Sequence, residues 1–265
     1  MVFIHEDDRA SAEGIFDVFN TYLTAQGSAF SGFPQDWNPC TGSSVGVNYW
    51  EGDNAFLLLA LNYYTLKTGD STKYATLSQM LIEWLLLRAD HCDEIVAEGV
   101  ANMYAALKPH VSNPSVRSRL SLLKSCFEST VDYPHVLDHT VRGALVFGNQ
   151  KGFDFTLNFA RTEVWDRNGR SIKAMSAFSG DSFINVEISA QLLLTGVVTN
   201  LEGQLPGLQS ELEKMWIHGA AETGEGLPYF VTNIGFDQSA TFPIIDPTCY
   251  MLFVYWRFNP WGDNK

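Results

Sequence analysis

Carboxylate side chains stand at the starts of apolar segments in this sequence, where they are placed to transfer protons. Asp53 begins the run DNAFLLLALN, Glu98 is the second residue of AEGVANMYAAL, and Asp246 precedes PTCYMLFVYW. Glu187 lies near the start of a fourth segment, INVEISAQLLLTG. Acid–base cleavage of a glycosidic bond needs one protonated and one ionised carboxyl group on either side of that bond. We therefore take Glu98, Asp53, Asp246 and Glu187 as candidate catalytic residues.

Each of these acids also has a structural interpretation. A carboxylate in the first turn of a helix accepts backbone N–H groups and is stabilised by the positive end of the helix dipole. Glu187 lies inside an apolar segment, where an isolated charge is costly, so it either faces a cavity or pairs with Arg142 or Arg161. Glu51 lies in the loop before Asp53 and is a weaker catalytic candidate.

Aromatic and amide side chains accompany the acids. Tryptophan and tyrosine rings stack on the faces of sugars, and amides hydrogen-bond to hydroxyl groups. The residues of these types before or on the acid-bearing segments are Trp37, Tyr49, Trp50, Asn54, Asn102, Tyr104 and Asn185. We predict that they bind substrate, and that Trp37 and Trp50 lie at the edge of one cavity that Asp53 and Glu98 face.

Other catalytic chemistries have little support. His135 and His139 are spaced like metal ligands on one helix face, but the sequence shows no third ligand, so we expect no metal site. The sequence has no HExxH, no GxSxG and no glycine-rich phosphate loop, and we expect no cofactor. The cysteines have no CxxC spacing and are expected to be unpaired thiols: Cys40, Cys92, Cys126 and Cys249.

The composition indicates an acidic globular protein. Of the 265 residues, 46% are hydrophobic and 18% are charged, and the formal net charge is −13. Such a charge argues against nucleic acid and against anionic membrane surfaces as partners, so we expect a small-molecule or glycan substrate. The sequence does not set the oligomeric state. Met1 opens onto no leader-like segment, which predicts a cytoplasmic protein, or a secreted one if a leader has been removed.

Helices must position these side chains, because helical periodicity runs through most of the sequence. The segment 9–25 has an apolar face and ends at Gly27. Further helices are predicted over 53–67, 71–89, 97–108, 114–127, 134–148, 184–196, 208–221 and 247–258. The helices that begin with acids are apolar on most sides, whereas 71–89 and 114–127 are amphipathic and are expected to cover them. Alternation around the letters DRNG predicts a short β-hairpin near 161–178.

The predicted fold is mainly α, a single (α/α) toroid or barrel of helical hairpins over residues 1–265. The helix starts recur at a spacing of about 45 residues from Asp53 to Glu98, and at about twice that spacing from Glu98 to Asn185. Such a period is typical of repeated helix hairpins in an inner and an outer layer. Inner helices arranged in this way would direct the polar residues at one of their ends into a shared cavity.

Four stretches carry a family resemblance: GDNAFLLLALNYYTLKTGDSTKY, AEGVANMYAAL, FINVEISAQLLLTG and IIDPTCYMLFVYWRFNP. They resemble the inner-helix segments of the six-hairpin (α/α) toroid glycosidase-like superfamily. The second is similar to a Thr-Glu-His-Asn-Ile-Asp-x-Tyr segment of that family, with Glu98 and Tyr104 matching. The third resembles a Leu-Asp-Val-Gln segment at Asn185 and Glu187, and in the fourth Asp246 stands where the family has Glu.

The resemblance implies a carbohydrate-active enzyme that acts on an oligo- or polysaccharide by acid–base chemistry, most often glycoside hydrolysis and sometimes a lyase or epimerase reaction. One alternative is a terpene or isoprenoid cyclase-like toroid, with one acid in an aromatic cavity that stabilises carbocations. Another is a non-catalytic ligand-binding toroid, which Gly99, Val100 and Asn102 favour because the family pattern differs there. In the enzymatic hypotheses, Glu98 is expected to be the acid whose loss reduces turnover most.

Overall fold

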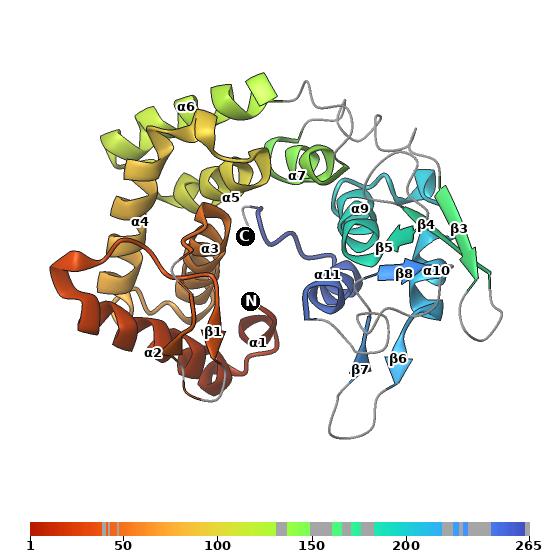
Figure 1. The fold of residues 1–265 in the computed structure, drawn as a ribbon, viewed down its shortest axis with the longest axis horizontal. Coiled ribbons are helices and arrows are strands. Elements are labelled where there is room, and N and C mark those ends of the chain that lie inside the picture. Colours follow the sequence, from red (N-terminus) through yellow and green to blue (C-terminus); the bar gives the residue numbers. More distant parts are fainter. Residues whose placement is uncertain are drawn as a thin grey trace. The chain divides into compact units, whose positions relative to one another are not determined.

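The computed structural model describes residues 1–38, 41, 43–46, 48–130, 137–148, 161–165, 171–175, 183–218, 225–227, 230–232 and 245–262. These residues are mainly helical, which confirms the predicted class (Figure 1). The chain divides into two compact units, Met1–Asp132 and Tyr133–Lys265, and each unit is described by itself below. The single toroid domain over 1–265 stays a prediction.

Unit 1 (Met1–Asp132) is built mainly from helices, which are joined by turns and by one long loop. Its helices are α1 (Val2–His5), α2 (Arg9–Gln26), α3 (Glu51–Thr68), α4 (Ala75–Ala89), α5 (Ala97–Leu107) and α6 (Pro114–Thr130), with 3₁₀ turns η1 (Gly27–Ala29), η2 (Cys92–Glu94) and η3 (Lys108–His110). The long loop between α2 and α3 carries one short antiparallel strand pair, β1 (Trp37–Asn38) and β2 (Ser43–Ser44). The helices predicted from periodicity are thus present, with shifts of a few residues at their ends.

Helices α3 and α4 form an antiparallel hairpin. Gly69 ends α3 in the left-handed conformation, with φ of 71°, and its N–H donates to the Thr65 carbonyl at 2.9 Å. Arg88 at the end of α4 reaches Glu51 at the start of α3, so the two helices run in opposite directions. The predicted apolar stripe of α4 is buried: Tyr74, Leu77, Leu81, Trp84 and Leu85.

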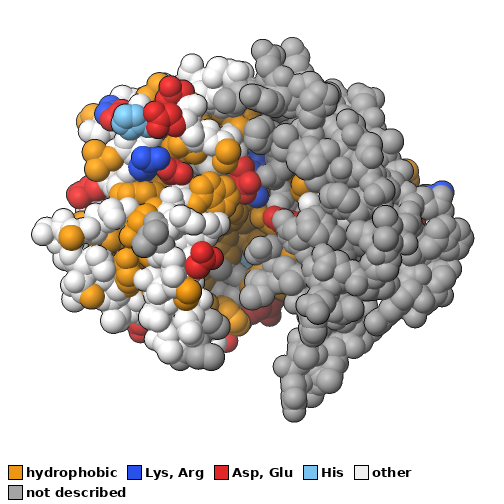
Figure 2. Space-filling model, in the orientation of Figure 1, with side chains coloured by type: hydrophobic (Ala, Val, Ile, Leu, Met, Phe, Trp, Pro, Cys, Tyr) orange, Lys and Arg blue, Asp and Glu red, His pale blue; other side chains and the backbone are white. Residues whose placement is uncertain are grey.

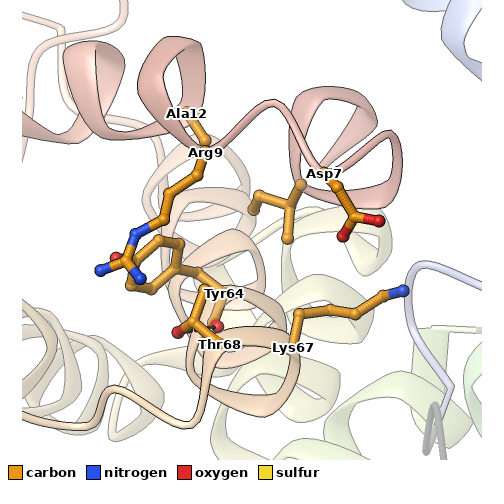
Figure 3. Close-up of a pocket in the computed structure, with 7 residues that line it drawn as sticks. Asp7, Arg9, Ala12, Tyr64, Lys67 and Thr68 are labelled. Carbon is orange, nitrogen blue, oxygen red and sulfur yellow. Dashed lines mark hydrogen bonds between the residues drawn. The ribbon is translucent and has the colours of Figure 1, made fainter.

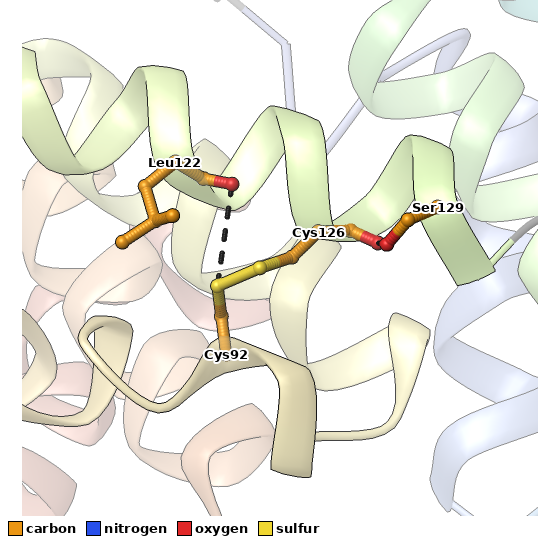
Figure 4. Close-up of a disulfide and its surroundings, with 4 residues drawn as sticks. All are labelled: Cys92, Leu122, Cys126 and Ser129. Atoms are coloured by element: carbon orange, nitrogen blue, oxygen red, sulfur yellow. Dashed lines mark hydrogen bonds between the residues drawn. A yellow bond between two sulfur atoms is a disulfide. The ribbon is translucent and has the colours of Figure 1, made fainter.

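Helices α5 and α6 form a second hairpin, closed by a disulfide. Cys92 in η2, just before α5, bonds to Cys126 in the last part of α6 (Figure 4). The expectation of unpaired thiols was therefore wrong for these two cysteines. Sequence spacing did not reveal the pair, because the hairpin brings together residues 34 positions apart. Cys40 lies outside the described residues.

Helices α3 and α5 run parallel to each other, and their contact is the most extensive between helices of unit 1. At one end, a Cβ atom at Gly99 would lie 3.8 Å from the backbone nitrogen of Gly52. Further along, the Asn62 side-chain amide donates to the Ala106 carbonyl at 2.9 Å. The start of α3 thus contacts the start of α5, and the later part of α3 contacts the later part of α5. The N-terminal ends of the two helices therefore lie together (Figure 1).

Unit 2 (Tyr133–Lys265) contains helices and short strand pairs. Its elements are α7 (Leu137–Phe147), β3 (Arg161–Trp165), β4 (Ser171–Met175), β5 (Phe183–Asn185), α9 (Val186–Val198), η4 (Glu202–Gln204), α10 (Leu208–Lys214), β6 (Ile217–His218), β7 (Glu225–Gly226), β8 (Phe230–Thr232) and α11 (Ile245–Trp256). Strands β3 and β4 pair antiparallel, which confirms the predicted hairpin. Helix α10 is shorter than the predicted 208–221, because the chain leaves it to pair as β6 with β7.

Helices α9 and α11 also run parallel. They pack along their lengths, and Arg257, the residue after α11, donates from Nη2 to the Val197 carbonyl in the last turn of α9 at 3.1 Å. Their C-terminal ends therefore lie together, and so do their N-terminal ends. Each unit thus has one pair of parallel apolar helices whose first turns contain acidic residues.

Acidic side chains are spread over the surface of the described residues. On the face drawn in Figure 2, acidic side chains of the described residues lie apart from one another, with apolar side chains between them. Among the described helices, none is long and apolar enough to cross a membrane.

Candidate functional site

The first turns of α3 and α5 meet at a pair of glycines. Besides approaching Gly52, a Cβ atom at Gly99 would lie 3.7 Å from the indole nitrogen of Trp50. A Cβ atom at Gly52 would lie 2.7 Å from ring carbons of the same indole. Only glycine therefore lets the Trp50 ring lie directly against the start of α3 while it also reaches α5. The indole covers the place where the two helices begin.

Asp53 and Glu98 belong to these two first turns. Both side chains are half-buried, and each follows or precedes one of the touching glycines by a single position. The parallel arrangement puts the positive ends of both helix dipoles at this end, which favours carboxylates there. The structure thus brings Asp53, Glu98 and Trp50 to the same end of one helix pair. A cavity in front of them stays a prediction.

Glu51 has a partner that explains its position. Its side chain is only 8% exposed, and its Oε1 atom accepts Arg88 Nε at 2.6 Å and lies 2.5 Å from Arg88 Nη2. The pair joins the start of α3 to the end of α4, and Arg88 neutralises the buried carboxylate charge, which would be costly without a partner. We therefore assign Glu51 to the fold.

Asn54 holds the loop before α3. Its side chain is buried, its Oδ1 accepts the Phe33 N–H at 2.7 Å, and its Nδ2 donates to the carbonyls of Phe33 at 3.0 Å and Trp50 at 2.9 Å. These bonds use both hydrogens of the amide group on the protein itself. Asn54 thus has a structural role, and its binding of substrate stays a prediction.

Trp37 belongs to an aromatic cluster between α2 and the same loop. Its ring lies 5.3 Å from Phe19 and 5.1 Å from Tyr22, centroid to centroid, and its indole N–H donates to the Pro34 carbonyl at 2.7 Å. Tyr49 is exposed, and its backbone pairs with Pro34. Burial first, and then the hydrogen bond to Tyr49, raise the pKa of Tyr22. The structure thus gives Trp37 a packing role, while Trp50 is the tryptophan at the helix starts.

The remaining residues predicted to bind substrate are buried or half-buried. Asn102 in α5 is fully buried and Tyr104 is half-buried. In unit 2, Asn185 caps α9, since its side-chain oxygen accepts the Ile188 N–H at 2.9 Å. The cap uses the acceptor of this amide, so its first role is structural.

The acids of unit 2 begin the second helix pair. Glu187 in the first turn of α9 is half-buried and accepts a hydrogen bond from Gln191 Nε2 at 2.9 Å. Arg142, one of the two predicted partners of Glu187, is buried and lies over the Trp261 ring at 5.6 Å. Asp246 lies in the first turn of α11, but its side chain is outside the described part.

The glycines Gly52 and Gly99 are the residues that sequence reasoning missed. Both follow a glutamate directly, as Glu51-Gly52 and Glu98-Gly99, and this repeated Glu-Gly pair at two helix starts was the available signal. This pair aligns Glu98 with Glu51, whereas Asp53 lies two positions after Glu51 on its own helix. Asp53 and Glu98 are therefore not at equivalent positions of their helices.

Comparisons with protein-family models, with curated proteins and with solved structures give no match. The resemblance to the six-hairpin superfamily therefore stays a prediction. Within the described residues, no group of three or more His, Cys, Asp or Glu side chains is arranged to hold a metal ion. His135 and the side chain of His139 lie outside that part.

Proposed function

We propose that the chain is a carbohydrate-active enzyme that cleaves an oligo- or polysaccharide by acid–base chemistry, with its site at the starts of α3 and α5. The observation that supports this function is the contact of Gly52 with Gly99. It supports the proposal because Asp53 and Glu98, from different helices, are each one position away from one of these glycines, and both glycines lie close to the Trp50 ring.

The residues have distinct roles in this proposal. Trp50 provides an aromatic face on which a sugar ring stacks. Glu98 is the general acid or base, and Asp53, in the first turn of α3, is the second carboxylate. In glycoside hydrolysis the separation of the two carboxyl groups decides whether water attacks directly or a covalent intermediate forms. Glu187 and Asp246 occupy corresponding places on the helix pair of unit 2.

The toroid belongs to the same proposal. The hairpins α3–α4 and α5–α6 supply a parallel apolar pair with one covering helix each, which is the repeating element of an (α/α) barrel. An (α/α) toroid of the six-hairpin kind would repeat this element around an axis.

The test is hydrolysis of a panel of cello-, xylo-, malto- and chito-oligosaccharides by the wild type and by Glu98→Gln and Asp53→Asn. On the cleaved member, each variant is expected to lose roughly 10²–10⁴-fold in kcat, because Gln and Asn keep the shape but transfer no proton. Glu94→Gln and Asp93→Asn are the matched controls. They change exposed acids of η2, a few residues before Glu98, and should keep full activity.

Three outcomes would contradict the proposal. The first is a cleaved oligosaccharide whose turnover is unchanged in Glu98→Gln and Asp53→Asn. The second is equal losses in the η2 controls. The third is a panel that binds, with Trp50→Ala weakening the binding, but is never cleaved; this result would support the non-catalytic alternative.

A further inference from the structure

A separate cavity lies at the other end of α3. It has a volume of about 150 Å³ and lies between the C-terminal turns of α3 and the segment that joins α1 to α2 (Figure 3). Its lining includes Tyr64, which follows Asp53 by eleven positions, or about 17 Å along a helix that rises about 1.5 Å per residue. The cavity is therefore distinct from the site proposed above.

The inner wall of this cavity is apolar. Ile4 from α1, Ala12 from α2 and Tyr64 from α3 are all buried. The Tyr64 hydroxyl donates to Glu13, so the tyrosine offers its ring to the cavity. The guanidinium of Arg9 lies 5.6 Å from the centre of that ring.

Arg9 is a fixed part of the wall. Its Nε donates to Glu13 at 2.6 Å and its Nη2 reaches Asp70 at 3.5 Å. Because both carboxylates neutralise it, Arg9 has little charge left for a ligand. Its role at the cavity is to cover one face of the Tyr64 ring, on the side away from Lys67 in Figure 3.

Two charged side chains of opposite sign remain at the cavity rim. Both are exposed, and the described residues place no carboxylate within ion-pair distance of the Lys67 ammonium, which lies 5.9 Å from the centre of the Tyr63 ring. Asp7 and Lys67 both act electrostatically on His5, and Asp7 also acts on Tyr63. Figure 3 shows Asp7 and Lys67 extending from opposite walls toward the same side of the cavity.

The backbone at Asp7 ends α1 and fixes the place of its carboxylate. Asp7 has φ of 59°, the left-handed conformation common just after a helix, and the Asp8 N–H donates to the Phe3 carbonyl at 2.8 Å. That conformation belongs to the turn between α1 and α2 from which the carboxylate reaches the cavity. A zwitterion offers each rim charge a group of opposite sign, whereas an anion would be repelled by Asp7 and a cation by Lys67.

We propose that this cavity binds a small zwitterionic amino acid with an apolar side chain. Lys67 pairs with the ligand carboxylate, Asp7 pairs with its ammonium group, and the side chain lies against Ile4, Ala12 and the Tyr64 ring. The volume restricts the ligand to a small molecule. This inference is independent of the proposed carbohydrate chemistry, because it uses none of the residues at the starts of α3 and α5.

The experiment is isothermal titration calorimetry of the full chain with L-leucine and with two analogues that each lack one charge. 4-Methylpentanoate keeps the carboxylate and the apolar chain, and 3-methylbutylamine keeps the ammonium. Leucine is expected to bind about tenfold or more tightly than either analogue, since each lost charge-assisted pair lowers affinity by roughly that factor.

Variants assign the binding to this cavity. Lys67→Gln and Asp7→Asn should each weaken leucine binding by about tenfold or more, and Asn suits the left-handed backbone at position 7. Lys124→Gln and Asp93→Asn, which change exposed charges elsewhere in unit 1, should bind leucine like the wild type. The proposal is overturned if millimolar leucine gives no binding, if either analogue or inorganic phosphate binds as tightly as leucine, or if the cavity variants bind like the controls.

Discussion

Glu51 lies against Arg88 in a nearly closed environment, with 8% of the carboxylate side chain exposed and 39% of the arginine side chain. A buried carboxylate that loses its partner keeps its desolvation cost and loses the attraction that offset it. Its neighbour Asp53 lies two positions later in the same first turn of α3 and is half-buried.

Arg88→Met should lower the free energy of unfolding by roughly 2–3 kcal/mol, less than a fully buried pair would cost because Arg88 is partly exposed. The double variant Arg88→Met with Glu51→Gln should recover about half of this loss, since no unpaired charge remains. Urea denaturation of the single and double variants measures both values. Equal stability of the wild type and Arg88→Met would show that the pair contributes nothing.

Glu13 is the centre of a second charged network. Lys73 at 2.6 Å, the Tyr64 hydroxyl and Arg9 at 2.6 Å all donate to its carboxylate, and these bonds lower its pKa from the ordinary 4.5 to about 2. Close by, burial and a hydrogen bond to Asp17 raise the pKa of Tyr74. Together these contacts tie α2 to α3 and to the turn before α4.

The network should make stability depend on pH in a defined window. A carboxyl group whose pKa falls on folding stabilises the fold above its unfolded pKa, near 4.5, and this contribution disappears as the pH falls toward 2. Glu13→Gln should therefore melt a few degrees below the wild type at pH 7, and the difference should vanish near pH 2. Glu128→Gln, which changes an exposed ion pair of 3.7 Å on α6, is the control and should show no such window. A constant difference for Glu13→Gln at every pH would contradict this assignment.

At the scale of elements, close helix packing depends on glycine at only some positions. Gly52 supports the Trp50 ring, whereas a Cβ atom at Gly14, in the middle of α2, would meet nothing within 4 Å. A Gly→Ala substitution should therefore change the free energy of unfolding in opposite directions at Gly52 and Gly14.

Gly52→Ala should lower the free energy of unfolding by roughly 1–3 kcal/mol, because the new methyl group displaces the indole. Gly14→Ala should raise it by roughly 0.5–1 kcal/mol, since alanine loses less conformational freedom in a helix. Chemical denaturation of both variants measures the two changes. Destabilisation by Gly14→Ala, or none by Gly52→Ala, would contradict the packing described for the start of α3.

Element positions were readable from the sequence where one physical signal dominated. The period of apolar residues gave α2 to α6 and the stripe of α4, and Gly69 gave the end of α3. The start of α4 was placed four residues early, because Asp70 accepts the N–H groups of Thr72 and Lys73 in a turn before the helix. Turn hydrogen bonds of this kind use the same residue types as a helix cap.

The candidate site was harder to read than the helices. The acids were identifiable because charge is rare at the edge of an apolar run. Glu51, Asn54 and Trp37 have structural partners that are far away in sequence. Arg88 is 37 positions from Glu51, Phe33 is 21 from Asn54, and Tyr22 and Phe19 are 15 and 18 from Trp37. Local patterns carry no information on such contacts.

At the scale of the whole molecule, the division into two units has a direct test. Unit 1 contains its own core of apolar helices and its own disulfide, so residues 1–132 should fold alone. The fragment is expected to be helical by circular dichroism and to melt cooperatively. Residues 1–107, which lack α6 and Cys126, are the control and should not. A non-cooperative melt of 1–132 would show that this unit needs the rest of the chain.

The compartment is also a whole-molecule question. Disulfides persist in oxidising surroundings such as the cell exterior and are rare in the cytosol. The Cys92–Cys126 bond is thus typical of the secreted alternative rather than of the cytoplasmic one, and the compartment stays a prediction.

The same bond has a consequence for a cut chain. Cys92 and Cys126 close a covalent ring that includes all of α5, η3 and most of α6. If a protease cleaves one peptide bond inside this ring, the two pieces stay joined through sulfur. The nicked protein would migrate as one band on a non-reducing gel and as two bands after reduction, while a cut outside the ring would release a fragment under both conditions.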